Sequence, residues 1–180
     1  PVHQGIVERG SKTGSFSYLL WPCRIGAFSV VMGKHAGNFD TSELPFSYIS
    51  VEDGKSVLTP AMNLFTVSIS RDGKKWPKRD RRTDNEKIDL INFEIFNPHT
   101  IQKMIIGAGL LDRLNQSAPK SREMISYKGV NINRLMLRTS KRYYDLAIKV
   151  YLYGELVKRL ANGKFKTISD KSVHGSAIAD

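Results

Sequence analysis

The sequence has little that would support a disulfide scaffold, a membrane protein or a disordered chain. Its 180 residues include one cysteine, Cys23, which excludes an intrachain disulfide. No apolar run approaches the roughly 20 residues that a membrane-spanning helix needs, and 41% hydrophobic content argues against disorder. No paired Cys or His spacing predicts a metal site, and no signal-peptide pattern follows Pro1. We therefore expect a cytoplasmic protein without membrane contact.

Acidic residues are also few, 17 against 28 basic ones, which gives a formal net charge of +11. Such an excess attracts phosphates, anionic small molecules or nucleic acid, without identifying which of them binds.

The beginning of the chain contains a six-residue repeat. Aliphatic or β-branched residues recur at Val7, Thr13, Leu19, Ile25 and Val31, and small residues recur at Ser11, Ser17, Cys23 and Ser29. One strand and one corner per six residues would place the first set in an interior and the second set at tight corners. Antiparallel strands punctuated by glycine and proline are the alternative, but they favour a period of two.

The motif Ile25-Gly26-Ala27-Phe28-Ser29-Val30 resembles the hexapeptide-repeat, left-handed β-helix superfamily. Residues 14–38, followed by LPFSYI and KWPKRD, are similar to the C-terminal part of a bacterial family in which such a solenoid precedes a helical tail and which brings no established activity. The resemblance implies a homo-oligomer, with the trimer as the common form.

These patterns predict an α+β protein: the end of a short left-handed parallel β-helix, a connecting β segment and an α-helical C-terminal region. We expect terminal coils in residues 1–38, a β/loop connector in 39–83, helices in 84–166 and a tail in 167–180. The solenoid should end at His35, because an imidazole is too large for the corner that serine fills elsewhere. So short a solenoid buries little alone, and we expect upstream coils of a longer chain, or another chain, to cover its open end.

Further elements are expected along the rest of the connector and at the first helix. Strands should occupy residues 45–51 and parts of 56–70, with turns at Asp53-Gly54 and Asp72-Gly73. Thr83 and Glu86 match a capping box, which predicts a helix that begins near Asp84 and carries Ile88, Ile91 and Ile95.

Two more helices and a hairpin are expected after that. Asn97-Pro98 predicts a helix start, with one face formed by Ile101, Met104, Ile105, Ala108 and Leu111, and Lys128-Gly129 predicts a hairpin turn. In the last helix one seam alternates spacings of four and three residues. We expect it to pack on the preceding helix, with a coiled coil between subunits as the alternative: Thr139, Tyr143, Leu146, Val150, Tyr153, Val157 and Leu160.

His35 is the candidate catalytic residue. By the resemblance, it would act as the general base of an acyltransferase, with Asn38 holding substrate, and imidazole titrates near neutral pH as that role requires. The alternative is a packing histidine, because no catalytic partner can be recognised beside it.

A basic segment between residues 71 and 82 is the candidate anion-binding site. It contains Arg71, Lys74, Lys75, Lys78, Arg79, Arg81 and Arg82. These cations would hold the phosphates of an acyl-coenzyme A, a nucleotide sugar or another anionic small molecule, and Trp76 would stack on a base. No P-loop or glycine-rich dinucleotide pattern accompanies them. The alternative is a solvated connector that Trp76 anchors to the core.

The patterns together favour the terminal part of a transferase-like protein that transfers an acyl group to a sugar or nucleotide-linked acceptor. Two other functions stay open: a non-catalytic assembly or capping module, and an anion-binding module that recognises nucleic acid through the basic segment.

Overall fold

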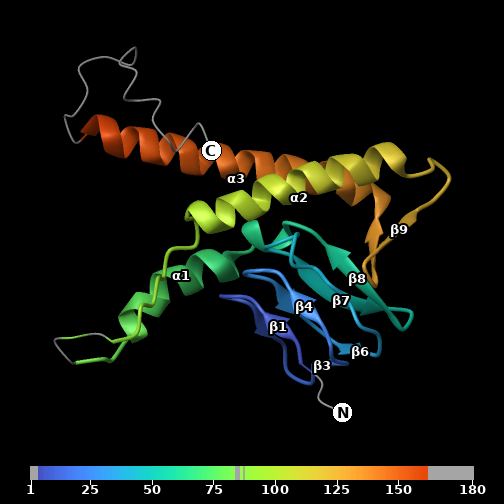
Figure 1. The fold of residues 1–180 in the computed structure, drawn as a ribbon, viewed down its shortest axis with the longest axis horizontal. Helices are drawn as coiled ribbons and strands as arrows, with labels where there is room; N and C mark the ends of the chain where they lie inside the picture. Colours follow the sequence, from blue (N-terminus) through green and yellow to red (C-terminus); the bar gives the residue numbers. More distant parts are fainter. Residues whose placement is uncertain (1–3, 84–85, 87, 162–180) are drawn as a thin grey trace.

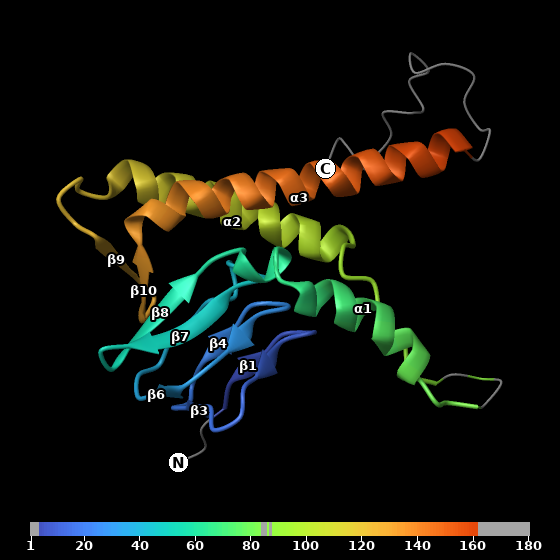
Figure 2. The same cartoon turned by 180° about the vertical axis from the view of Figure 1, so that it is seen from behind.

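The computed structural model describes residues 4–83, 86 and 88–161 of a mixed α/β protein. Short strands are stacked in its N-terminal part, and two long helices, α2 and α3, lie across the end of the stack that is remote from β1 (Figures 1 and 2). The helix α1 runs along the side of the stack. In the described part of the chain, no helix combines the length and the apolar character that a bilayer crossing requires.

Five two-residue strands begin at intervals of six residues, as the repeat predicted. They are β1 (Ile6–Val7), β2 (Lys12–Thr13), β3 (Tyr18–Leu19), β4 (Arg24–Ile25) and β5 (Val30–Val31). Each of the first two pairs in parallel with the strand eighteen residues further along, so that Ile6 lies opposite Arg24 and Lys12 opposite Val30. Successive strands therefore fall in three separate sheets, and β4, β5 and β6 return to the sheets of β1, β2 and β3.

The prediction that this series ends at His35 is wrong. β6 (Lys34–His35) pairs in parallel with β3, so His35 takes a strand position opposite Leu19 rather than a corner. β6 begins only four residues after β5, and Gly33, whose φ is 94°, turns the chain through this shortened corner. β7 (Tyr48–Glu52) again lies eighteen residues beyond β5, because the segment between β6 and β7 regains the residues that the corner at Gly33 lacks.

The interior of the stack is filled by side chains from the aligned strands. Ile25, Val31 and Ile49 are fully buried, and Val31 and Ile49 lie opposite each other in paired strands. One corner carries an aromatic stack: Phe28 and Phe46, both with φ of 55°, place their rings 5.0 Å apart. Ile25 and Val31 of the predicted interior set therefore lie in the core, whereas Val7, which is 48% exposed, and Thr13, also exposed, do not.

The largest sheet continues past β7 and changes its pairing. β8 (Lys55–Thr59) is antiparallel to β7 through the predicted Asp53-Gly54 turn. β10 (Val130–Asn133) pairs in parallel with β8, and β9 (Met124–Tyr127) pairs antiparallel with β10, which confirms the hairpin at Lys128-Gly129.

Of the one or two strands expected in residues 56–70, the structure has one, β8, and the turn predicted at Asp72-Gly73 is wrong. A short 3-10 helix, η1 (Met62–Leu64), leads instead into α1 (Val67–Arg79), so most of the basic segment is helical. Spacings of four and three residues place Ile69, Gly73 and Trp76 on one face of this helix. That face packs inward, because Ile69 is buried and the Trp76 ring stacks on Phe28 at 6.1 Å.

The helix expected from Asp84 is also wrong where it can be judged. Asp84, Asn85 and Lys87 lie outside the described residues, as does the predicted tail 167–180, and residues 88–96 have no regular secondary structure. We call residues 88–96 the strap. The Arg9 guanidinium, in the turn after β1, donates hydrogen bonds to the backbone carbonyls of Asn92 and Glu94. In a helix, these carbonyls would instead accept hydrogen bonds from backbone amides four residues later.

The helix predicted at Asn97-Pro98 begins there, and the last predicted helix is also present. α2 (Pro98–Ser117) has Asn97 as its N-cap in a capping box with Thr100. Its predicted inner face is buried except for Ile105, which is exposed. α3 (Arg134–Ala161) packs along α2, and its buried residues are Leu137, Ser140, Tyr144 and Ala147. The predicted packing of the four-three seam on α2 is therefore wrong, since that seam lies one position away.

Candidate functional site

His35 lies in the interior of the stack. Its side chain is 1% exposed, its Nδ1 shares a 2.9 Å hydrogen bond with the Ser56 hydroxyl of β8, and its ring packs edge-on against Phe39. Nε2 is buried and has no hydrogen-bond partner among the described residues. Burial lowers the pKa of His35, and a backbone contact with Met32 offsets part of that shift. A substrate would reach this ring only if the strands around it separated.

Asn38 is not joined to His35 by any hydrogen bond among the described residues. Its amide nitrogen donates to the Leu20 carbonyl at 2.8 Å, which ties the segment after β6 to the preceding turn of chain. The side chain itself is exposed. The two residues predicted to share a substrate site therefore serve separate contacts here.

The basic segment forms an exposed stripe on α1 and just after it. Lys74, Lys75, Lys78, Arg79 and Arg81 are exposed, and none of them takes part in an ion pair within the described part of the chain. We call these five residues the basic stripe. Spacings of one, three and four residues place the first four on the outer face of α1, so the helix concentrates positive charge on one side.

Two other residues predicted for this site are already engaged. Arg82 makes a two-pronged ion pair with Asp80, at 2.8 Å from Nε and 2.5 Å from Nη2, and this contact raises the pKa of the guanidinium. Trp76 is half-buried against Phe28, so its ring is not free to stack on a base. This contact agrees with the alternative interpretation of Trp76, in which its ring anchors the segment to the core.

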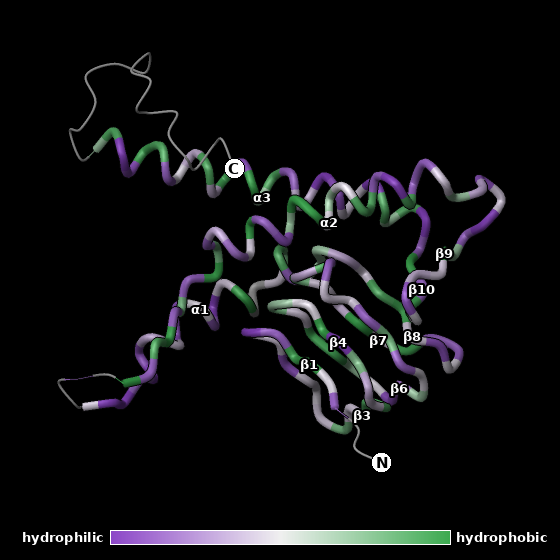
Figure 3. The backbone as a smooth tube through the Cα atoms, viewed as in Figure 1, coloured by the Kyte–Doolittle hydropathy of each residue, from purple (hydrophilic) through white to green (hydrophobic). Residues whose placement is uncertain are grey.

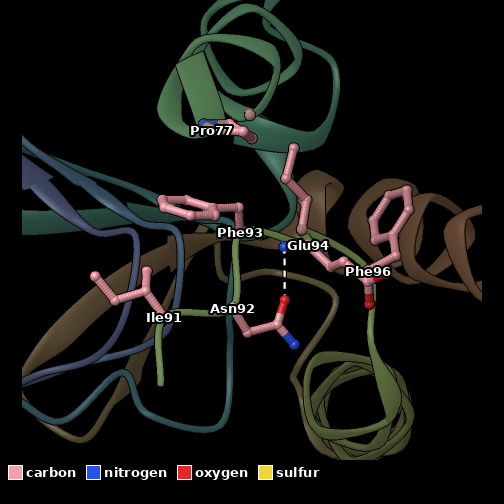
Figure 4. Close-up of a pocket in the computed structure, with 8 residues that line it drawn as sticks. Pro77, Ile91, Asn92, Phe93, Glu94 and Phe96 are labelled. Carbon is pink, nitrogen blue, oxygen red and sulfur yellow. Dashed lines mark hydrogen bonds between the residues drawn. The ribbon is translucent and has the colours of Figure 1, made fainter. Parts of the chain in front are cut away.

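A shallow hollow lies between α1 and the strap (Figure 4). Pro77 borders it from α1, and Ile91, Phe93 and Phe96 come from the strap, where the Asn92 side-chain oxygen accepts a hydrogen bond from the Glu94 amide at 2.7 Å. The basic stripe is not part of its lining. The lining thus combines apolar side chains with Asn92 and Glu94, and it includes no basic side chain that would attract an anion.

A cluster of ionisable residues that sequence reasoning missed joins the hairpin to the segment before β7. Tyr127 donates to a Glu43 carboxylate oxygen at 2.5 Å, and Lys128 forms an ion pair with the same oxygen. Lys128 and Tyr127 lower the pKa of Glu43, while burial and the Glu43 contact raise the pKa of Tyr127 to about 12. These groups satisfy one another, so we interpret them as a structural tie. No pattern could reveal them, because they are 84 and 85 residues apart.

The helices contact the last turn of the strand stack through several buried groups. The Tyr144 hydroxyl of α3 donates to the Pro45 carbonyl at 2.5 Å. The part-buried Lys103 of α2 donates to the Ser42 carbonyl at 3.1 Å. It also reaches Glu8 at 2.6 Å, and because Glu8 directly follows β1, this second contact is with the first turn. At Gly107 a Cβ atom would lie 2.8 Å from the Glu43 carbonyl oxygen, so α2 lies directly on this segment. We call α2, α3 and the β9–β10 hairpin the cap.

The four-three seam of α3 is exposed along most of its length. The exposed fractions are 52% for Leu146, 55% for Val150, 65% for Tyr153 and 63% for Val157. α3 extends beyond α2, and in this extension hydrophobic and hydrophilic stretches alternate (Figures 1 and 3). Tyr143 is partly buried against the core, and its ring centroid lies 4.0 Å from that of Phe65.

Within the described residues, no three His, Cys, Asp or Glu side chains gather in a way that would hold a metal ion. Comparison with known proteins gives one family: a model described as a domain of unknown function (DUF4954) matches residues 1–115, and the chain belongs to this family. No curated protein and no solved structure gives a significant match.

Proposed function

We propose that this member of the DUF4954 family is the terminal section of a left-handed parallel β-helix of the hexapeptide-repeat class, and that it acts as a non-catalytic cap. The eighteen-residue offset between parallel strands supports the proposal most directly. In a hexapeptide solenoid, three strands of six residues complete one turn, so neighbouring turns pair at this offset.

The two ends of the strand stack differ in a way that fits a cap. Among the described residues, β1, β2 and β3 each pair with one neighbour only, so the first turn has unpaired edges. The cap covers the opposite end through Tyr144, Lys103 and Gly107. Exposed strand edges can pair with strands of other chains. A cap at one end of the strand stack limits such pairing to the edges at the other, open end. Further turns, from a longer form of the protein or from another chain, would occupy the open end.

The parallel pairing is tested by cysteine cross-linking in a Cys23→Ser background. Ile6→Cys with Arg24→Cys joins two exposed positions that are opposite each other in β1 and β4. Ile6→Cys with Thr13→Cys, also both exposed, is the matched control, because an antiparallel hairpin of β1 and β2 would bring these two together. We expect an intramolecular disulfide in the first pair only. Cross-linking of the control pair alone would refute the proposed solenoid.

The capping role is tested by separating α2 from the last turn. Gly107→Val forces a side chain against the Glu43 carbonyl, whereas the Cβ added by Gly109→Val would meet only the end of the Arg113 side chain, 3.6 Å away. We expect Gly107→Val to promote aggregation, measured by light scattering and thioflavin fluorescence, and Gly109→Val to leave the protein unchanged. A thermal melt should show that Gly107→Val is destabilised. If it is destabilised but aggregates no more than Gly109→Val does, the capping role is refuted.

The basic stripe supports anion binding as a second candidate function. The cations of the basic stripe have no ion-pair partner among the described residues, and four of the five lie on one face of α1. Like charges so placed repel one another, and a phosphate-bearing ligand would relieve that repulsion. We expect polyphosphate, and coenzyme A if acyl transfer is the activity, to raise the melting temperature. The shift should be lost in Lys75→Gln with Lys78→Gln but kept in Lys55→Gln, an exposed lysine outside α1. No shift with either ligand at low salt would refute this candidate.

Acyl transfer with His35 as the base stays a prediction of the resemblance. The burial of His35 and its bond to Ser56 support a packing role instead. The basic stripe also lies apart from it: α1 contacts the corner at Phe28, and Asp72 pairs with Lys12 of β2, whereas His35 belongs to the β3–β6 sheet.

A further inference from the structure

We propose that the basic stripe binds the phosphate backbone of a double-stranded nucleic acid, without reading the base sequence. The inference rests on anion binding, the second candidate function above, and adds the class of ligand. It depends on three properties of the outer face of α1: a positive charge, a convex shape and the absence of exposed large apolar side chains among those that the structure describes.

The charges of α1 are divided between its two sides. Each residue turns the helix by about 100°, so the four α1 residues of the basic stripe fall within an arc of about 140°, opposite Gly73, which packs against the strap. Arg71, whose side chain is 57% exposed, falls inside the arc and contacts Asp72 at 3.5 Å. Asp72 is the only acidic residue of α1, falls outside the arc and pairs with Lys12 of β2. The outer face of α1 is therefore positive.

The described acidic residues after α1 do not lie on this face. Asp80 is paired with Arg82, whose guanidinium also donates to the Asp89 carbonyl at 2.9 Å. Glu86 and Asp89 are exposed beyond the end of α1, and Glu94 lines the hollow on the side of α1 that faces the strap. A polyanion that approaches the outer face thus meets cations first.

α1 also holds its cations at fixed distances. Its inner face is anchored, because Ile69 is 3% exposed and the Trp76 ring stacks on Phe28. At about 1.5 Å per residue, the cations from Arg71 to Arg79 extend over about 12 Å of the helix axis. A duplex carries one phosphate charge for about every 1.7 Å of its axis, so it can present phosphates along this whole length. The few phosphates of a nucleotide or of coenzyme A cannot.

The shape of the surface favours a long ligand as well. Small molecules bind in concave pockets that enclose most of their surface. The basic stripe lies on the outer side of a helix, and the hollow beside α1 has none of the stripe residues in its lining. Figures 1 and 2 show α1 at the side of the molecule, with its C-terminal end pointing away from the strand stack. A rod-shaped ligand can approach such a surface from outside.

Two other extended anions fit this surface less well. A helix that binds a membrane surface places large apolar side chains beside its cations, but the exposed Ile88 and Leu90 lie instead next to the acidic Glu86 and Asp89. Proteins that bind single strands stack the bases on aromatic rings. The only aromatic residue of α1, Trp76, is already packed on the core. The backbone of a duplex needs neither feature.

Fluorescence anisotropy of a labelled DNA duplex, titrated with the full chain at several salt concentrations, tests the inference. We expect the logarithm of the binding constant to fall with the logarithm of the salt concentration at a slope of about −4, because four or five cations each release a counterion. Lys75→Gln with Lys78→Gln should weaken binding at least about 10-fold at low salt and make the slope less negative by about 2. A second duplex of unrelated sequence should behave alike.

The matched control is Lys34→Gln with Lys55→Gln, which removes the same charge from two exposed lysines outside α1 and should bind as the parent does. All four lysines are exposed, so neither double variant should change the melting temperature. Absence of duplex binding at low salt would overturn the inference, and a melting-temperature rise with polyphosphate would then leave anion binding intact. Equal weakening in the two double variants would overturn it, since net charge alone would explain the binding. So would tighter binding of the single strand, or binding to phosphatidylserine vesicles in place of the duplex.

Discussion

Because His35 is buried, the free energy of unfolding of this protein should depend on pH just below pH 6.5. In that range the titration of carboxylates contributes little to the pH dependence. In the folded state burial lowers the pKa of His35 below 6.5, whereas the unfolded chain regains the ordinary value. As the pH falls through 6.5, the unfolded state therefore binds a proton first. The stabilisation from neutral His35 is complete above pH 6.5 and is lost progressively as the pH falls from there towards the folded-state pKa.

The size of this effect follows from the number of protons involved. One proton taken up by the unfolded state alone lowers the free energy of unfolding by at most about 1.4 kcal/mol for each pH unit. The carboxylates of Asp40, Glu43 and Asp72 also have lowered pKa values, but their ordinary values are 3.8 to 4.5, so their loss begins at lower pH. The interval between about pH 5 and 6.5 is thus dominated by histidine.

Urea unfolding followed by circular dichroism between about pH 7.5 and 5 measures this dependence. The His35→Leu variant, with Ser56→Ala to avoid an unpaired hydroxyl, should lose most of the slope below pH 6.5, because Leu19 occupies the aligned position in the paired strand. His99→Gln, at an exposed position on α2, should keep the slope. An unchanged slope in the His35→Leu variant would refute our account of His35 as a buried neutral group.

Two further predictions concern the joints between the cap and the strands. Gly129 and Gly54 both have positive φ, 88° and 74°, but only at Gly129 would a Cβ atom meet backbone, 2.1 Å from the Asn38 carbonyl oxygen. Thermal unfolding should show a loss of about 1 kcal/mol for Gly54→Ala and several times more for Gly129→Ala, and equal losses would contradict the close contact. Tyr144→Phe removes a buried 2.5 Å hydrogen bond and should cost about 1–2 kcal/mol in urea unfolding, whereas no loss would show that the bond is not needed.

The strands of the N-terminal part could be predicted because their information is local. Each unit of six residues contains its own strand and corner, so Val7, Ile25 and Val31 are separated by multiples of six residues. The prediction failed at His35, where a short corner at Gly33 is compensated only before β7. Sequence reasoning that considers one six-residue unit at a time cannot detect a shortened corner whose missing residues are regained in a later segment.

The errors in α1 and the strap have a different origin, since distant residues decide both. Asp72-Gly73 has the composition of a turn, but Lys12 binds Asp72 from β2, and Phe28 receives the ring of Trp76. Likewise, Arg9 holds carbonyls of the strap that a helix would need for its own hydrogen bonds. The cations of α1 and His35 could be identified as candidate site residues from the sequence. Whether they lie close enough to form one site depended on these tertiary contacts.

The α3 seam was recognised from its spacing, yet its partner was assigned wrongly, for a physical reason. The stripe that packs on α2 includes Ser140 and Ala147, because α2 approaches closely enough that a Cβ at Gly107 would lie 3.0 Å from the Tyr144 ring. Hydrophobicity alone highlights the larger residues beside it, such as Leu146 and Val150, which the fold leaves in water. Exposed apolar surface costs about 25 cal/mol per Å² relative to burial, so a stripe of this regularity is expected to be buried in another contact.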